Sequence, residues 1–272
     1  SEDDSAEFDP FAGGSIEQVV ATTEAQREVW LGDRLGQEAS LAYNEATALR
    51  LRGALDEQAL AKALDRLVER HDALRATISP DGTQLLIGGA TPVALARHDL
   101  GALDAAAQRQ AIDAQGAAAV REPFSLEHGP LFRAALSRLS ADEHVLLLSA
   151  HHAVCDGWSW GVITEDLGRL YAEELGAGPT PDAPARYVDY AAWETDEAAG
   201  PAMQAHVDYW LARFSGGTLP VLELPLDHAR PAVRTFRSKR IDHLLERDLV
   251  DALRKLGAGS GTSLFAAMLG GF

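Results

Sequence analysis

Adjacent histidines and a nearby Asp-Gly pair form a dense polar cluster at His151, His152, Asp156 and Gly157. The cluster follows the apolar run at 145–148, which is typical of a buried strand. Polar groups at the end of a buried strand cost free energy unless they serve chemistry or a satisfied hydrogen-bond network. An imidazole can take up a proton near neutral pH, so the cluster indicates general base catalysis or substrate positioning.

Three interpretations of this cluster compete. If His151 and His152 continue the strand, their side chains point to opposite faces, so they could not ligate one ion together. No second His/Cys pair lies at metal-like spacing, so we predict no metal site. Two interpretations stay open: a structural cluster in which Asp156 accepts backbone hydrogen bonds, and a site with one imidazole in a cleft.

Covalent catalysis needs a nucleophile that the chain does not offer in a familiar setting. No Gly-x-Ser-x-Gly elbow occurs, and Cys155 lies within the loop rather than at the start of a helix. A covalent acyl-enzyme is therefore not supported, and we expect Cys155 to be a small packing residue.

Composition and charge exclude several classes of partner. The chain has 272 residues, 24 basic and 41 acidic side chains and a net charge of -17, which disfavours nucleic acids and anionic membranes as partners. Its one cysteine permits no intrachain disulfide. No apolar run is long enough for a membrane span and the N-terminus is no secretory signal, so we predict a cytoplasmic protein.

Hydrophobic periodicity predicts the elements that must position the cluster. Alternating apolar residues indicate strands at 131–139 and 144–150, joined as an antiparallel hairpin that ends at the histidines. Further strands are expected at 47–52, 83–87 and 236–245. Helical spacing indicates helices at 24–35, 57–68, 105–120, 158–175, 187–193, 201–214, 247–256 and from 262 onward.

The motif and its flanks resemble a known family. The run His151-His152-Ala153-Val154-Cys155-Asp156-Gly157-Trp158-Ser159 resembles the signature of condensation domains of nonribosomal peptide synthetases, in the chloramphenicol acetyltransferase-like superfamily. Three further segments resemble other core motifs of that family in chain order: TEAQREVW at 23–30, RHDALR at 70–75 and YVDYAAW at 187–193. The runs EPF at 122–124 and GPLFR at 129–133 are also similar to those domains.

The resemblance implies an α/β fold, a two-layer sandwich in which a chloramphenicol acetyltransferase-like lobe has a mixed or antiparallel sheet flanked by helices. It implies an N-terminal lobe at 21–178 and the start of a C-terminal lobe at 179–272, after an acidic linker or tail at 1–20. The later core motifs of the second lobe have no counterpart before Phe272. We therefore expect an incomplete second lobe and no catalysis by the chain alone.

The resemblance assigns the catalytic motif to His151, His152, Asp156 and Gly157. It implies that His152 faces a tunnel and acts as a base or as a positioner of an amine, while His151 faces the packed interior. Asp156 is implied to be structural, in an ion pair with Arg75 that holds the motif loop. Removing one partner from a buried pair of that kind is costly.

The resemblance also implies roles for residues around the motif. Gly157 would permit close approach near a thioester, and Trp158 and Ser159 would line or support the tunnel entrance. Two residues of the flanking motifs can be given purely structural places that are compatible with this assignment. Gln26 is expected on a helix surface and Trp193 in the core.

The implied function is amide bond formation between a carrier-bound acyl or peptidyl thioester donor and a carrier-bound aminoacyl acceptor. No cofactor is expected to bind directly, because carrier proteins present both substrates on phosphopantetheine arms. The expected partners are the upstream donor carrier, the downstream acceptor carrier and neighbouring synthetase modules. The stretch at 32–46 resembles condensation domains that follow a polyketide carrier in hybrid assembly lines, which implies an acyl donor.

Two other classes of function stay open. The cluster also fits a stand-alone acyl-CoA-dependent acyltransferase, although the motifs at 23–30 and 187–193 disfavour it. A non-catalytic docking or recruiting domain is disfavoured by the intact histidines, since recruitment needs no base. Heterocyclisation relatives carry aspartates in place of the histidines, and neither histidine is replaced here.

Overall fold

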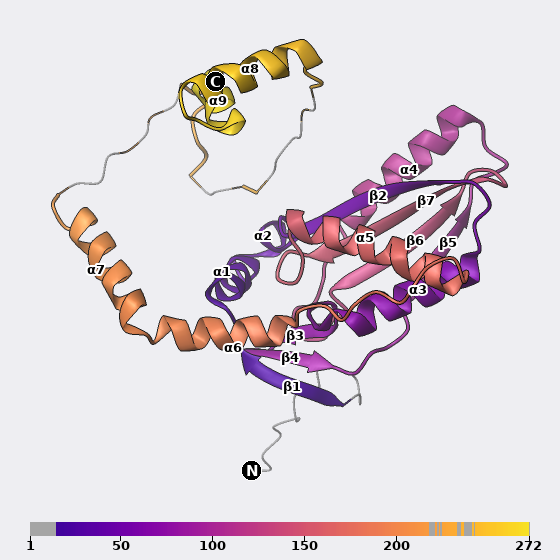
Figure 1. The fold of residues 1–272 in the computed structure, drawn as a ribbon, viewed down its shortest axis with the longest axis horizontal. Helices are drawn as coiled ribbons and strands as arrows, with labels where there is room; N and C mark the ends of the chain where they lie inside the picture. The colour runs from indigo at the N-terminus through magenta and orange to yellow at the C-terminus, as the bar shows by residue number, and fades with distance from the viewer. Residues whose placement is uncertain are drawn as a thin grey trace. The chain divides into compact units, whose positions relative to one another are not determined.

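The structure is a computed structural model that describes residues 15–217, 221, 223, 225–232, 235–236, 241 and 243–271. The chain divides into two compact units, Ser1–Phe236 and Arg237–Phe272. The first unit contains two β-sheets with their flanking helices (Figure 1). The second contains α8 (Arg247–Gly259) and α9 (Leu264–Gly271), which contact each other.

The larger sheet carries the predicted hairpin. It is built from β2 (Asn44–Arg52), β5 (Leu95–Asp99), β6 (Phe132–Arg138) and β7 (Glu143–His151), in the order β2-β7-β6-β5. β6 and β7 form the antiparallel hairpin, and β2 pairs antiparallel with β7. β5 pairs parallel with β6, so the sheet is mixed, as predicted.

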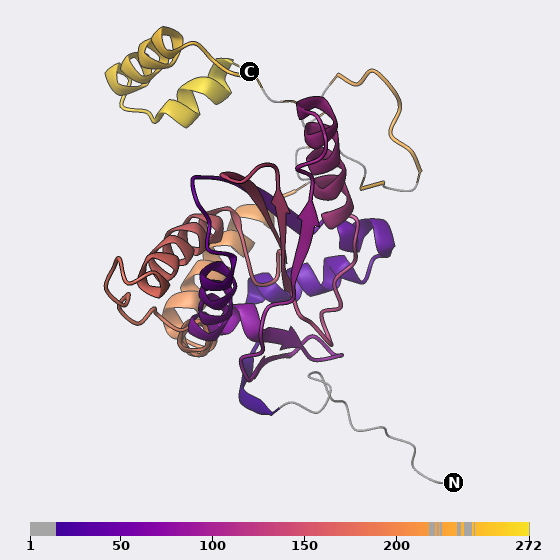
Figure 2. The same cartoon turned by 90° about the vertical axis from the view of Figure 1, so that its right-hand side faces the viewer.

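One face of this sheet is covered by α3 (Glu57–Arg70) and α5 (Gly157–Glu174), as Figure 2 shows. Leu146 and Leu148 of β7 belong to the same buried cluster as Leu64 of α3. Burying an aliphatic side chain of this size stabilises the fold by about 1.5–3 kcal/mol. On the other face, α4 (Ala105–Ala119) contacts β2 and β7 but buries no residue of its own. The helical and sheet layers form the expected α/β sandwich.

The smaller sheet corrects the predicted N-terminal tail. Its strands are β1 (Ile16–Ala21), β3 (Ala76–Ile78) and β4 (Gln84–Gly88), in the order β1-β4-β3. The tail predicted at 1–20 is therefore wrong over residues 16–20, which pair with β4. β1 lies at the sheet edge and no residue of it is fully buried, and its sequence IEQVVA does not alternate between apolar and polar residues.

Short elements near the start of the chain were not all predicted. The helix expected at 24–35 is α1 (Glu24–Asp33), and α2 (Gln37–Leu41) follows it without having been predicted. The 3-10 helix η1 (Asp72–Arg75) continues α3 and leads into β3. None of the helices in the described ranges is both long and apolar enough to cross a membrane.

The segment after residue 178 does not leave the first unit at once. α6 (Tyr187–Ala198) contacts β1 and η1, and α7 (Pro201–Phe214) follows it. The two compact units divide after Phe236, and α6 packs on the first of them. The strand predicted at 236–245 lies in part outside the described residues. Assignment of 179–272 to a second lobe stays a prediction.

Candidate functional site

The end of β7 separates the two histidines into different environments. His151 is the last residue of the strand and is fully buried, with an exposed fraction of 0%. His152 begins the loop that leads to α5, and its side chain is 39% exposed. The alternation predicted for a strand end is therefore observed, with one imidazole in the packed interior and the other accessible.

His151 is hydrogen-bonded through one ring nitrogen, Nδ1. The backbone N–H of Ala153 donates to Nδ1 of His151 at 3.2 Å, so the ring proton lies on Nε2. Nε2 lies 3.7 Å from Oδ1 of Asp33, a distance typical of a charge–dipole contact rather than a hydrogen bond. Burial raises the pKa of Asp33, but contacts with His151 and Ser40 outweigh it and leave that pKa below its usual value. His151 is thus buried in the packed interior, with one ring nitrogen bonded to the backbone.

His152 is hydrogen-bonded through Nδ1, and no residue in the described part of the chain bonds its other ring nitrogen, Nε2. Nδ1 lies 2.8 Å from the carbonyl oxygen of Cys155. Because a carbonyl oxygen can only accept, Nδ1 must carry the ring proton, and Nε2 then carries the lone pair of the neutral ring. The backbone N–H of His152 donates to the Tyr43 carbonyl at 2.8 Å, and the two rings stack with centroids 6.5 Å apart. This tautomer is the one that a general base needs.

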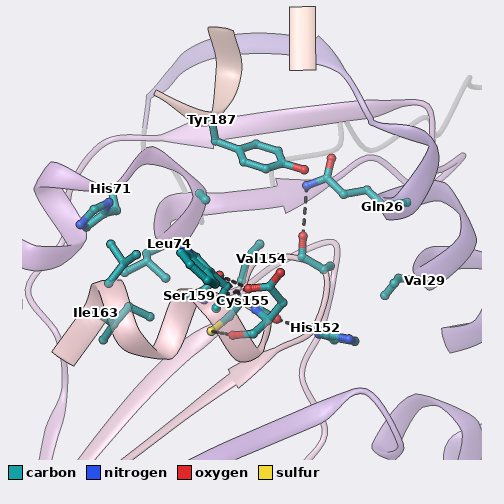
Figure 3. A pocket seen from close by; sticks show the side chains of 16 residues that line it. Gln26, Val29, His71, Leu74, His152, Val154, Cys155, Ser159, Ile163 and Tyr187 are labelled. Atoms are coloured by element: carbon teal, nitrogen blue, oxygen red, sulfur yellow. Dashed lines mark hydrogen bonds between the residues drawn. The ribbon is translucent and has the colours of Figure 1, made fainter. Parts of the chain in front are cut away.

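His152 lines a cavity of about 440 Å³ in the first unit. Its walls come from α1, η1, the loop at 152–156, the first turns of α5 and the start of α6 (Figure 3). Apolar side chains such as Leu74 and Ile163 lie beside polar ones such as Gln26 and Tyr187. A concave, mainly apolar site with a few convergent polar groups is the usual form of a small-molecule site.

Asp156 caps α5 and does not pair with Arg75. Oδ1 of Asp156 accepts from the backbone N–H of Ser159 at 2.8 Å and from its hydroxyl at 2.6 Å. The backbone N–H of Asp156 donates to the Ser159 hydroxyl oxygen at 3.1 Å, which completes a capping box. The Ser159 contacts hold the pKa of Asp156 below its usual value. Arg75 instead donates to Oε2 of Glu17 at 2.8 Å and to the Gly88 carbonyl.

The predicted ion pair between Arg75 and Asp156 is therefore wrong. Arg75 ends η1 beside the smaller sheet, where the carbonyl of Gly88 and the carboxylate of Glu17 lie within its reach. Glu17 belongs to β1, a strand that the sequence did not predict. The carboxylate of Asp156 already accepts from the backbone N–H and the hydroxyl of Ser159 at the start of α5.

Of the three other residues predicted for the site, Trp158 and Ser159 line the cavity and Gly157 does not. Trp158 is 84% exposed and lines the cavity together with Ser159. Gly157 opens α5, and a Cβ atom at that position would meet open space. No protein atom therefore requires glycine there, and the predicted role in close approach of a thioester stays a prediction.

Hydrogen bonds join the four sequence motifs around the cavity. Nε2 of Gln26 donates to the carbonyl of Ala153 at 3.1 Å, a bond drawn in Figure 3. The hydroxyls of Thr23 and Tyr187 are 3.2 Å apart, and Asp72 accepts from the backbone N–H of Tyr187 at 2.9 Å. Gln26 is buried, so its placement on a helix surface was wrong.

Two further predictions concern Trp193 and Cys155. Trp193 is 56% exposed, so its placement in the core was wrong for this chain. Burial, followed by the carboxylates of Glu45 and Asp156, raises the pKa of the Cys155 thiol to about 12. A thiol with that pKa is protonated at neutral pH, which supports packing rather than nucleophilic attack.

Across the described ranges, no cluster of three or more His, Cys, Asp or Glu side chains could hold a metal ion.

Sequence reasoning missed Glu45, the second residue of β2. Oε1 of Glu45 lies 3.4 Å from Nδ1 of His152, and Oε2 accepts from Nε1 of Trp160 at 2.8 Å. Glu45 and His152 are more than a hundred residues apart in sequence, and only the pairing of β2 with β7 brings them together. No local pattern could have linked them.

Comparisons with known proteins identify the family. The condensation domain family model matches residues 16–270. Chondramide synthase cmdD of Chondromyces crocatus is 37% identical over 258 residues, covering 93% of this chain and 6% of that protein. A linear gramicidin synthase of Brevibacillus parabrevis is 39% identical over 262 residues, covering 94% of this chain and 3% of that protein. The chain spans a small part of these relatives.

Solved structures with similar folds cover most of the chain. The SgcC5 protein of Streptomyces globisporus is 28% identical with a TM-score of 0.70, over 90% of this chain and 56% of that one. The X-domain in its complex with OxyB from teicoplanin biosynthesis is 27% identical with a TM-score of 0.74, over 92% of this chain and 55% of that one. This chain spans about half of each structure. Because the family model matches nearly all of it, the chain belongs to the condensation domain family.

Proposed function

We propose that this chain supplies the histidine-bearing part of a site that forms amide bonds between two carrier-bound substrates. The observation that carries the proposal is His152, whose Nδ1 proton is fixed by the Cys155 carbonyl and whose ring lines a cavity. Membership of the condensation domain family supports the same assignment. The donor is an acyl or peptidyl thioester, and the acceptor is an aminoacyl thioester.

The proposed reaction converts a thioester into an amide and a thiol, and it needs no cofactor. The acceptor amine attacks the carbonyl carbon of the donor thioester, so that a C–N bond forms and the C–S bond breaks. Nε2 of His152 first takes the proton that the amine nitrogen loses. It then passes this proton to the thiolate of the departing arm. Holding two tethered reactants in line contributes about 7–11 kcal/mol, so that one imidazole suffices.

The partners follow from the substrates. Phosphopantetheine arms of an upstream donor carrier and a downstream acceptor carrier would enter the cavity, and neighbouring synthetase modules would present those carriers. The hybrid resemblance at 32–46 favours an acyl donor delivered by a polyketide carrier. A cytoplasmic setting is part of the same proposal.

The test uses this chain within a complete condensation domain, with loaded donor and acceptor carriers. We expect His152→Ala to lower the rate of amide formation by about a hundredfold or more, as for loss of a general base. His98→Ala, an exposed histidine on β5, is the matched control and should keep the parent rate. Product formation at the parent rate by His152→Ala would overturn the catalytic assignment. The chain alone, without the rest of the domain, should form no product.

A second candidate function is docking without catalysis. The similar X-domain is known in complex with another protein, OxyB, which favours this alternative. Retention of the parent rate by His152→Ala would support docking. The stand-alone acyltransferase alternative is tested by replacing the loaded donor carrier with free acyl-CoA. This alternative predicts equal rates with acyl-CoA and with the carrier.

A further inference from the structure

Glu45 occupies an unusual position beside the candidate base. Its carboxylate oxygen Oε1 lies 3.4 Å from Nδ1 of His152, the nitrogen that donates to the Cys155 carbonyl at 2.8 Å. The Nδ1 proton of His152 is therefore directed at the neutral Cys155 carbonyl, with the Glu45 carboxylate within ion-pair distance of the same nitrogen. Nε2, on the opposite side of the ring, is left for the substrate.

The Glu45 carboxylate is itself fixed in place. Its second oxygen, Oε2, accepts from Nε1 of Trp160 at 2.8 Å. Trp160 packs against the main buried cluster between α5 and the larger sheet, so its indole is anchored. The Glu45 side chain is 30% exposed, less than a free surface carboxylate, and both of its oxygens are committed to the site.

The arrangement matters once the ring takes up a proton. Protonation at Nε2 makes the ring a cation, and a carboxylate 3.4 Å from Nδ1 is then attracted to it much more strongly than to the neutral ring. An interaction that strengthens as charge develops lowers the barrier and leaves substrate binding unchanged. The Cys155 carbonyl can hold the tautomer, but it carries no charge to balance the imidazolium.

We propose that Glu45 is a positioning residue of the site, which orients His152 and balances the charge of its ring during proton transfer. The inference rests on the proposed role of His152. Trp160 is the anchor that holds the Glu45 carboxylate at the ring.

The experiment compares steady-state rates of amide formation in a complete condensation domain carrying this chain. Glu45→Gln keeps the shape of the side chain and an acceptor for Trp160 but removes the charge. We expect kcat to fall about tenfold with KM for the acceptor carrier unchanged. That loss is smaller than the about 10⁴-fold loss seen where the carboxylate alone fixes the histidine tautomer, because the Cys155 carbonyl remains. Glu143→Gln is the matched control, since Glu143 lies at the other end of the β2–β7 pair with a side chain 27% exposed.

The double variant His152→Ala/Glu45→Gln separates a positioning role from damage to the fold. If Glu45 acts through His152, the double variant is as slow as His152→Ala, whereas independent damage multiplies the two losses. Equal urea midpoints for Glu45→Gln and Glu143→Gln are also expected. A kcat of Glu45→Gln within twofold of the parent, or a tenfold further loss in the double variant, overturns the inference. An active His152→Ala variant instead overturns the proposed function, and the inference with it.

Discussion

Asp72 connects two motifs that are far apart in the chain, and its removal tests whether α6 is held by that connection. The side chain is 6% exposed and its two oxygens accept from the backbone N–H groups of Tyr187 at 2.9 Å and Val188 at 3.1 Å. Both donors lie in the first turn of α6, where helical partners are lacking. In Asp72→Ala these donors lose their partner.

The expected cost follows from the two bonds. A hydrogen bond to a charged group contributes about 1.5–3 kcal/mol, so two at the low end give roughly 3 kcal/mol. Val188 is itself buried, so water cannot replace the carboxylate without opening the helix start. Asp104→Ala is the matched control, because Asp104 caps α4 through the same type of bond to Ala106 and Ala107 but is exposed. Loss of an exposed cap costs about 1 kcal/mol.

Hydrogen exchange at the Tyr187 and Val188 amides measures this cost where it arises. A loss of roughly 3 kcal/mol corresponds to about a hundredfold faster exchange at these amides, since 1.4 kcal/mol is about tenfold. Urea unfolding should show a larger destabilisation for Asp72→Ala than for Asp104→Ala. Unchanged protection of both amides, or equal losses in the two variants, would refute the reasoning that a buried carboxylate holds α6.

Two further predictions concern the motif loop. Cys155, whose thiol pKa is raised to about 12 by burial, should resist alkylation by iodoacetamide at pH 8 in the folded chain and react readily in urea; fast labelling of the folded chain would contradict this. Asp156→Ala should destabilise the start of α5 at pH 7 by about 1 kcal/mol, as for loss of a helix cap. The Ser159 hydrogen bonds lower the folded pKa of Asp156, so this contribution is present above the unfolded pKa of about 3.9 and is lost as the pH falls through the folded value. Denaturant curves of the parent and Asp156→Ala should therefore converge in acid, and a gap that persists below both pKa values would count against the argument.

Local patterns predicted the elements that deliver the histidines. The alternation before His151 predicted the hairpin of β6 and β7, because one face of each strand must be apolar to pack on α3 and α5. The helix starts at Glu24 and Glu57 follow from the caps Thr23 and Asp56, whose side chains accept from backbone N–H groups within three residues. Signals of this kind lie within a single element.

Elements held by distant partners were missed or misjudged. β1 is paired on one side and mostly exposed, and its sequence IEQVVA lacks the apolar–polar alternation that marks a half-buried strand. Because β1 was not predicted, the partner of Arg75 was predicted wrongly. Arg75 pairs with Glu17 of that strand instead of Asp156. α6 was predicted as a helix, but its return to the first unit depends on hydrogen bonds to Asp72 across more than a hundred residues.

The sequence by itself determined the family motif, the order of most helices and strands, and the separation of the two histidines, because each is a property of adjacent residues. Tertiary structure decided which tautomer His152 adopts, which carboxylate lies beside it and what Asp156 binds. These depend on strand register and on loop carbonyls, since a hydrogen bond needs atoms within about 3 Å, and adjacency in the chain does not report that distance.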